Sequence, residues 1–154
     1  MLEGAGLGDD RVKNHLVELE VKANALKNAG QNTEAAELFS LIVKEQPDWE
    51  HGTALHLLAQ CYEDAGQLTL AEQNYRAALK YEPKNDIFLG GLASFLYLHG
   101  EPEAAFSAYL DLFNVYKSAA DAERVNSCMT ALETLGERIG WPKGLIAAKI
   151  EQGK

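Results

Sequence analysis

The sequence predicts an all-α protein built from a helical hairpin that repeats along the chain. Gly30, Gly66 and Gly100 each follow a stretch with apolar residues at helical spacing and precede a second such stretch. They stand 36 and 34 residues apart. Glycine readily takes the left-handed conformation that ends a helix, so each of the three is expected at the turn of a hairpin. A helix–turn–helix unit of this length is typical of α-helical repeat proteins.

Small and large apolar residues recur at matching places in three successive segments, residues 16–49, 52–85 and 86–119. The middle segment carries the complete pattern, with Leu55, Leu58, Ala59, Tyr62, Ala71, Tyr75, Ala78 and Pro83. In this pattern the chain resembles the tetratricopeptide repeat family. The first segment departs from it at Lys22, which replaces a core leucine, and the third at Lys117, where a proline is expected.

The resemblance implies a right-handed superhelical solenoid of three tetratricopeptide helical hairpins with a C-terminal capping helix pair. We expect a disordered tail over residues 1–8 and a single domain over residues 9–154, with the cap at 120–154. Pairs of alanines should face each other across each hairpin and let its two helices approach closely. These are Ala23 with Ala35, Ala59 with Ala71, and Ala93 with Ala105. Because no hairpin can bury its apolar face alone, neighbouring hairpins must stack.

The helices of the three hairpins are bounded by residues that start or stop a helix. Asp9 or Asp10 can cap the first helix, which runs to residue 29, and the second covers residues 32–46. Pro47 and Asp48 then break the chain and cap a third helix over residues 49–65. The remaining three are expected at residues 68–81, 86–99 and 102–116.

The repeat pattern ends after residue 116, and a different helix is expected to close the stack. Ser118–Asp121 resembles a capping box, and one apolar stripe follows it. The stripe consists of Val125, Cys128, Leu132, Leu135 and Ile139. Pro142 can open a last short helix. A one-sided helix of this kind can cap the open end of a solenoid, and a docking surface for another subunit is the alternative.

Composition argues against two classes of partner. The net charge is −9, and residues 121–154 hold five acidic and five basic residues, so the repeats carry the whole excess. An acidic chain lacks the basic footprint that nucleic acid requires, and solubility accounts for the acidity. No apolar stretch is long enough to span a membrane.

The compartment predicted from the sequence is the cytoplasm. Residues 1–10 have neither a basic segment nor an apolar core, so they do not resemble a signal peptide. Cys61 and Cys128 lie in helical patterns without disulfide or metal spacing, which fits buried thiols in a reducing compartment.

No catalytic, metal or cofactor site is expected. The GAGLG stretch at residues 4–8 follows no strand, so it is interpreted as part of the tail rather than a phosphate loop. His51 and His56 are five residues apart and fall on different faces of a helix. Neither Ser107 nor Ser127 lies in a nucleophile motif. The chain is therefore predicted not to be an enzyme.

The resemblance also implies where a partner would bind, because in this family the first helices of successive hairpins line a concave groove for a peptide or helix. The corresponding residues here are Val17, Glu20, Asn24, Lys27, Thr53, His56, Gln60, Glu63, Ile87, Gly90, Ser94 and Tyr97. Tyr97 is expected to contribute most, since tyrosine is enriched among interface hot spots. An ordinary solvated face is the alternative interpretation.

The residues that two subtypes of the family use for binding can be compared with those of this chain. The chaperone-tail binders share a carboxylate clamp of lysines, an arginine and an asparagine, whereas this chain has Glu20, Asn24, Ile87 and Gly91 there, so only the asparagine remains. A heat-shock cochaperone is therefore not expected. Bacterial type III secretion chaperones for translocator proteins are similar in being small, acidic and cytoplasmic. They carry a longer helix before the first repeat than the segment expected here.

The sequence thus predicts a non-catalytic protein–protein interaction module or adaptor that binds a peptide or helix of a partner protein in the groove. The alternatives are a small bacterial chaperone for secreted proteins and an inhibitor or immunity protein. The pattern leaves the identity of the partner and the oligomeric state open.

Overall fold

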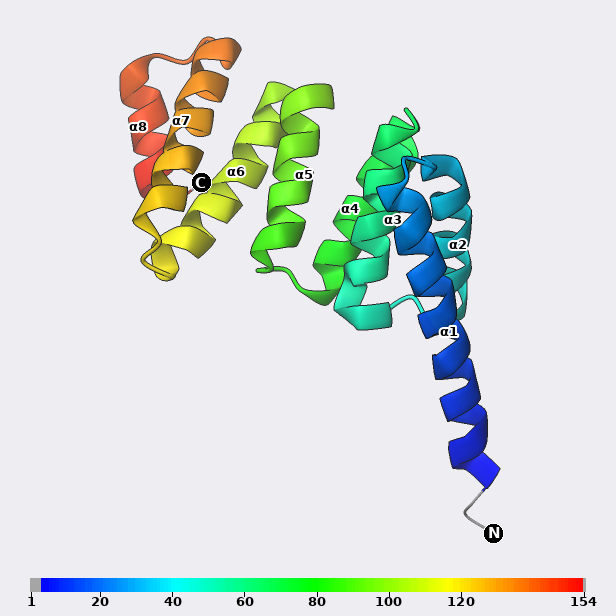
Figure 1. Cartoon of the computed structure of the whole chain (residues 1–154). Coiled ribbons are helices and arrows are strands. Elements are labelled where there is room, and N and C mark those ends of the chain that lie inside the picture. Colours follow the sequence, from blue (N-terminus) through cyan, green and yellow to red (C-terminus); the bar gives the residue numbers. More distant parts are fainter. Residues whose placement is uncertain (1–3, 154) are drawn as a thin grey trace. The chain divides into compact units, whose positions relative to one another are not determined.

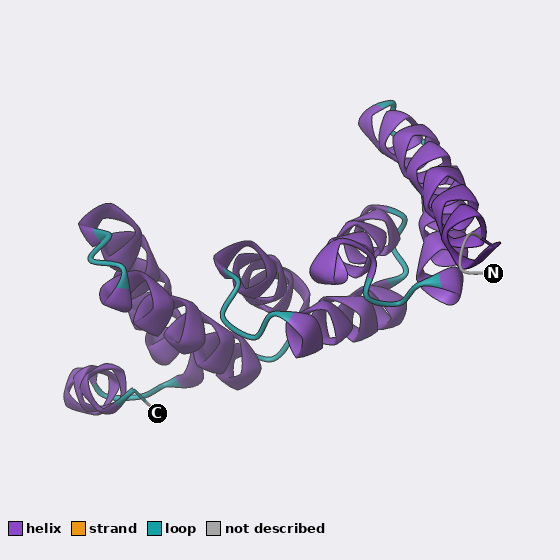
Figure 2. Ribbon diagram, turned by 90° about the horizontal axis from the view of Figure 1, so that it is seen from below, coloured by secondary structure: helices purple, strands orange, loops and turns teal. Residues whose placement is uncertain are grey.

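The computed structural model describes residues 4–153, and in that range it contains eight α-helices and one short 3-10 helix (Figure 1). Within these residues Figure 2 shows only helices and loops, with no strand. The predicted all-α fold of repeated helical hairpins is confirmed. The chain divides into two compact units, Met1–Ala78 and Leu79–Lys154, with the boundary inside α4 (Leu68–Tyr81). The single domain over residues 9–154 stays a prediction.

The first unit is built on two hairpins. Its elements are α1 (Gly4–Asn28), α2 (Asn32–Glu45), the 3-10 helix η1 (Trp49–Gly52), α3 (Thr53–Asp64) and most of α4. α2 packs against both α1 and α3 (Figure 1). The core of the first unit contains Leu16, Ala23, Ala35, Ala36, Phe39, Ile42, Trp49, Ala54, Leu58 and Cys61.

The second unit holds the third hairpin and the two C-terminal helices. Its elements after α4 are α5 (Asp86–His99), α6 (Pro102–Ser118), α7 (Ala122–Ile139) and α8 (Lys143–Gln152). α6 packs against both α5 and α7, and α8 packs against α7 (Figure 1). Trp141, in the loop before α8, meets the ring of Phe106 edge-on at 5.1 Å between ring centres.

The alanines predicted at the hairpin crossings are completely buried. Ala23, Ala35, Ala59, Ala71, Ala93 and Ala105 are all 0% exposed. A side chain of one carbon lets two helices approach closely, and interiors are packed so tightly that a larger residue there would force the helices apart.

Two of the three predicted turn glycines adopt the left-handed conformation. Gly30 and Gly66 both have a φ of 77°, and the amide that follows each glycine bonds back to a carbonyl five residues earlier. Gly100 differs, because its φ of −102° and ψ of −172° are extended. A Cβ at Gly100 would lie 3.1 Å from both Cα and the carbonyl oxygen of Leu96, so a larger residue would crowd the backbone of the preceding helical turn.

The turn between α6 and α7 has the same hydrogen bonds as the glycine turns but contains no glycine. Ala120 takes the left-handed position with a φ of 54°, and the amide of Asp121 bonds the carbonyl of Tyr116 at 3.1 Å. The predicted capping box at Ser118 is wrong, since Ser118 is the last residue of α6. Asp121 is the N-cap of α7 instead, and its side chain accepts a hydrogen bond from the amide of Arg124.

Two predicted boundaries in the first unit are also corrected. α1 begins at Gly4, so residues 4–8 are helical rather than a tail, and residues 1–3 of that tail lie outside the described residues. α3 begins at Thr53 rather than Trp49. Glu50 and His51 have φ values of 50° and 54°, which interrupt the α-helical hydrogen bonds before Thr53.

Candidate functional site

The residues predicted to line a groove lie on the first helices of the hairpins, namely α1 and α3 in the first unit and α5 in the second. Most of them are at least partly accessible. In the first unit Val17 is exposed, and Glu20, Asn24, Lys27, Thr53, Gln60 and Glu63 are half-buried. In the second, Ile87 and Ser94 are exposed, and Gly90 and Tyr97 are half-buried. His56 is the exception.

His56 is a core residue of the first unit, with only 4% of its surface exposed. Its ring meets that of Tyr75 edge-on, with 5.5 Å between the ring centres. Its Nε2 is hydrogen-bonded to the side-chain amide of Gln60 at 3.2 Å. Burial, with a smaller contribution from the charge of Lys27, lowers the pKa of His56 to about 4. His56 is therefore neutral at physiological pH and helps to join α3 to α4.

Two acidic residues predicted to line the groove accept hydrogen bonds from other residues of the first unit. Tyr75 on α4 donates a hydrogen bond of 2.6 Å to Oε2 of Glu63. Burial, followed by this hydrogen bond, raises the pKa of Tyr75, so the phenol keeps the proton that it donates. Glu20 on α1 accepts a hydrogen bond of 3.2 Å from Nε1 of the buried Trp49. Glu63 and Glu20 thus hold α4 and η1 in place.

On α5 of the second unit an apolar stripe is open to solvent. Ile87 is 64% exposed and Leu98 is 69% exposed. The exposed Ser94 lies between them, and spacings of seven and four residues place all three on one side of the helix. Leu98 was not among the predicted groove residues. The helical spacing that places Ile87 and Ser94 on this face also places Leu98 there.

Tyr97 is less accessible than the repeat alignment predicted. Its ring meets the ring of Tyr109 on α6 at 6.0 Å, with 78° between the ring planes. The guanidinium of Arg138, from the last turn of α7, lies 4.7 Å from the centre of the Tyr97 ring. Sequence reasoning did not include Arg138, because it is 41 residues away and lies on the polar side of a helix assigned to the cap.

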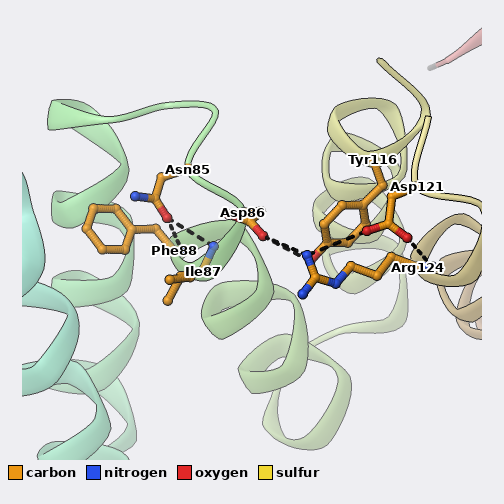
Figure 3. A network of polar contacts seen from close by, with 7 residues as sticks. All are labelled: Asn85, Asp86, Ile87, Phe88, Tyr116, Asp121 and Arg124. Carbon is orange, nitrogen blue, oxygen red and sulfur yellow. Dashed lines mark hydrogen bonds and ion pairs between the residues drawn. The ribbon is translucent and has the colours of Figure 1, made fainter. Parts of the chain in front are cut away.

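A polar network holds the ends of three helices in the second unit together (Figure 3). Arg124 on α7 lies 3.6 Å from carboxylate oxygens of both Asp86 and Asp121. The hydroxyl of Tyr116 donates to Asp86, and Arg124 lies over the ring of Tyr116. Asn85 caps α5 by accepting hydrogen bonds from the amides of Ile87 and Phe88. This network positions α5 and α7 beside α6.

Metal ligands and cysteine thiols are the catalytic groups that the described residues allow us to assess. Within residues 4–153 no group of three His, Cys, Asp or Glu side chains could hold a metal ion. Cys61 and Cys128 are free and buried, and burial raises the pKa of both thiols, which disfavours the nucleophilic thiolate. None of the described helices combines the length and the apolar character needed to cross a membrane.

Comparison with known proteins supports the repeat assignment. Residues 56–123 match the family described as tetratricopeptide repeat. No curated protein matches the chain.

The fold is shared with solved structures, among them these two. One is a chain in the crystal structure of a T3SS complex from Aeromonas hydrophila, at 20% identity and a TM-score of 0.73, with 88% of this chain and 90% of that chain covered. The other is the Sgt2 TPR domain from Aspergillus fumigatus, at 18% identity and a TM-score of 0.66, with 82% and 80% covered. Residues 56–123 therefore carry tetratricopeptide repeat sequence, and the chain has the fold of these two structures.

Proposed function

We propose that this chain is a non-catalytic protein-interaction module that binds a peptide or helix of a partner protein on α5, the first helix of its third hairpin. The observation that carries the proposal is the exposed stripe on α5. Ile87 and Leu98 remain largely open to solvent, although most large apolar residues in the described part of the chain are at least partly buried. Exposed apolar residues that share one helix face favour a protein ligand, because contact with a partner removes them from water.

The dimensions of the stripe suit a short segment of polypeptide. Ile87 and Leu98 are eleven residues apart, which corresponds to about 16 Å along a helix. That distance matches about five residues of an extended peptide or about three turns of a helix. The small side chain of Ser94 between them would let the partner's backbone come close to α5.

The first unit, taken by itself, also offers polar groups to the backbone of a ligand, through the half-buried residues Asn24, Thr53 and Gln60. His56, Glu20 and Glu63 are assigned to internal contacts instead, so we remove them from the proposed contact set. Val17 and Lys27 stay in it, because they are on α1 and remain accessible.

Two serines of the third hairpin make a matched test. Ser94 on α5 and Ser107 on α6 are both exposed, but only Ser94 lies on the proposed face. Once a partner has been isolated by affinity capture, calorimetry should show that Ser94→Arg weakens binding at least tenfold. Ser107→Arg should change the affinity less than twofold. If both variants bind like the wild type, or both lose binding equally, the partner does not bind α5.

A second candidate function is a chaperone for secreted proteins. It is favoured by the similarity to a chain of a T3SS complex, which covers most of both chains. The chaperone proposal expects a secreted client held in a non-globular form. Hydrogen exchange of the client in the isolated complex decides this, since a client with the protection of a folded globular protein contradicts it.

We also propose that the protein acts in the cytoplasm, with a protein or peptide rather than a nucleic acid as its partner. The free thiols of Cys61 and Cys128 and the net charge of −9 support this assignment.

A further inference from the structure

The feature that points beyond a generic peptide-binding face is the contact between Arg138 and Tyr97. The two residues come from different helices, and the guanidinium carbon lies 4.7 Å from the ring centre. Nη1 of Arg138 also donates a hydrogen bond to the backbone oxygen of Tyr97. At 3.4 Å this bond is longer than the usual range, so it uses little of the arginine's hydrogen-bonding capacity.

Arg138 has no ion-pair partner among the described residues, although the whole sequence has 23 acidic and 14 basic residues. A guanidinium has five N–H donors, and only Nη1 is engaged here. The side chain is exposed, so the remaining donors are accessible. Contact with the tyrosine ring restricts the position of the guanidinium before any ligand binds.

Arg124 on the same helix shows the contrasting arrangement. It also lies over a tyrosine of the third hairpin, with its guanidinium carbon 5.3 Å from the ring centre of Tyr116. Unlike Arg138, it is already paired with Asp86 and Asp121 (Figure 3). Arg124 is therefore paired with carboxylates of the protein, whereas Arg138 has no carboxylate partner in the part of the chain that the structure describes.

We propose that Arg138, held by Tyr97, receives a side-chain carboxylate of the bound peptide. Leu98, the residue after Tyr97, is 69% exposed and offers an apolar contact to the same peptide. The partner segment therefore carries an acidic residue close to an apolar one. A carboxylate bound to arginine makes hydrogen bonds roughly twice as strong as those between neutral groups, which suits a specificity contact. This inference rests on the proposed binding of a peptide to α5.

A peptide library tests the inference without knowledge of the natural partner. Random peptides displayed on phage through their C-termini are selected on the full chain, since this display removes the terminal carboxylate and leaves only side-chain acids. Peptides selected on the wild type should be enriched in Asp and Glu next to apolar residues. Selection on Arg138→Gln should lose the acidic enrichment, whereas selection on Arg124→Gln should keep it.

A selected peptide, synthesised with both ends blocked, then allows a double-mutant cycle with its Glu→Gln or Asp→Asn twin. Arg138→Gln should weaken binding of the acidic peptide about tenfold and leave binding of the twin nearly unchanged. Arg138→Lys should recover part of the loss, and Arg124→Gln should stay within twofold of the wild type. Thermal melting of each variant confirms that the fold is retained.

The outcomes separate this inference from the proposed function. Selected peptides that lose binding to Ser94→Arg but show no preference for acidic residues would support the binding face on α5. The same result would refute the role of Arg138. Equal weakening of the acidic peptide and its twin by Arg138→Gln also refutes it, because Arg138 would then act only by holding α5 and α7 together. If no selected peptide is affected by Ser94→Arg, both proposals fail.

Discussion

At the scale of single residues, His56 shows how burial changes the role of a polar side chain from binding a partner to packing in the core. The repeat alignment places it on the binding face, yet the ring is enclosed against Tyr75 and bonded to Gln60. A buried imidazole resists protonation, since the charged form loses its hydration, and the nearby charge of Lys27 adds to the effect. The residue thus contributes to stability in a way that depends on pH.

We expect the protein to lose stability as the pH falls below about 6.5. The pKa of His56 is about 4 in the folded state and 6.5 in the unfolded state, so the unfolded chain binds the proton first. The contribution is complete above pH 6.5 and is lost as the pH falls toward 4. From pH 7 to pH 5 this amounts to about 2 kcal/mol. Urea unfolding at several pH values measures it.

His56→Phe is the matched variant, because it keeps an aromatic ring beside Tyr75 and cannot be protonated. Its stability should vary less between pH 7 and pH 5 than that of the wild type, by about the same 2 kcal/mol. An identical pH dependence in both proteins would show that protonation of His56 is not the source of the effect.

At the scale of elements, the turns show which helix ends can be recognised from sequence. Gly30 and Gly66 mark left-handed turns, and both were predicted. The turn after α6 has the same hydrogen bonds, but Ala120 takes the left-handed position. Because no glycine marks this turn, its conformation could not be recognised from the sequence. The contacts of α7 with α6, together with the N-cap at Asp121, hold this alanine in an unfavourable conformation.

Ala120→Gly should therefore stabilise the protein by about 1 kcal/mol. A left-handed residue with a Cβ costs about 1–2 kcal/mol, and the entropy that glycine adds to the unfolded chain offsets part of the gain. Ala119→Gly is the control, because Ala119 has a φ of −84° and gains nothing from the substitution. Thermal unfolding should give a higher midpoint for Ala120→Gly and a lower one for Ala119→Gly. The reverse order would show that the turn is not strained.

At the scale of the whole molecule, the last two helices complete the second unit. α7 covers α6, where Phe106 and Phe113 are buried, and Trp141 adds an edge contact to Phe106. Without this cover the apolar side of α6 would face water, since a helical hairpin buries only part of its apolar surface by itself.

Deletion of residues 119–154 should therefore cause aggregation or abolish cooperative unfolding. Light scattering and thermal melting followed by circular dichroism measure the two effects. Deletion of α8 alone is the milder control, because α8 buries only Ile146 and Ile150 among its described residues. A truncated chain that stays soluble and monomeric and unfolds cooperatively would mean that α7 and α8 form a docking surface for a partner instead.

Much of the fold could be predicted from the sequence because its signals are local. Glycine spacing and apolar periodicity identify the helices, and the six alanines that recur in the repeats are all fully buried. The binding face on the first helices of the hairpins stays a prediction. The internal contacts of His56, Glu20 and Glu63 could not be predicted, because they join these residues to partners far along the chain or on another helix.

The sequence by itself determined the all-α fold of repeated hairpins, most of the helix bounds and the left-handed turns at Gly30 and Gly66. Only the tertiary structure decided that His56 is enclosed, that Arg138 rests on Tyr97 and that Arg124 pairs with Asp86. The physical reason is the range of the interactions. Helical hydrogen bonds and apolar spacing act within a few residues, whereas these contacts join residues on different helices and depend on how those helices dock.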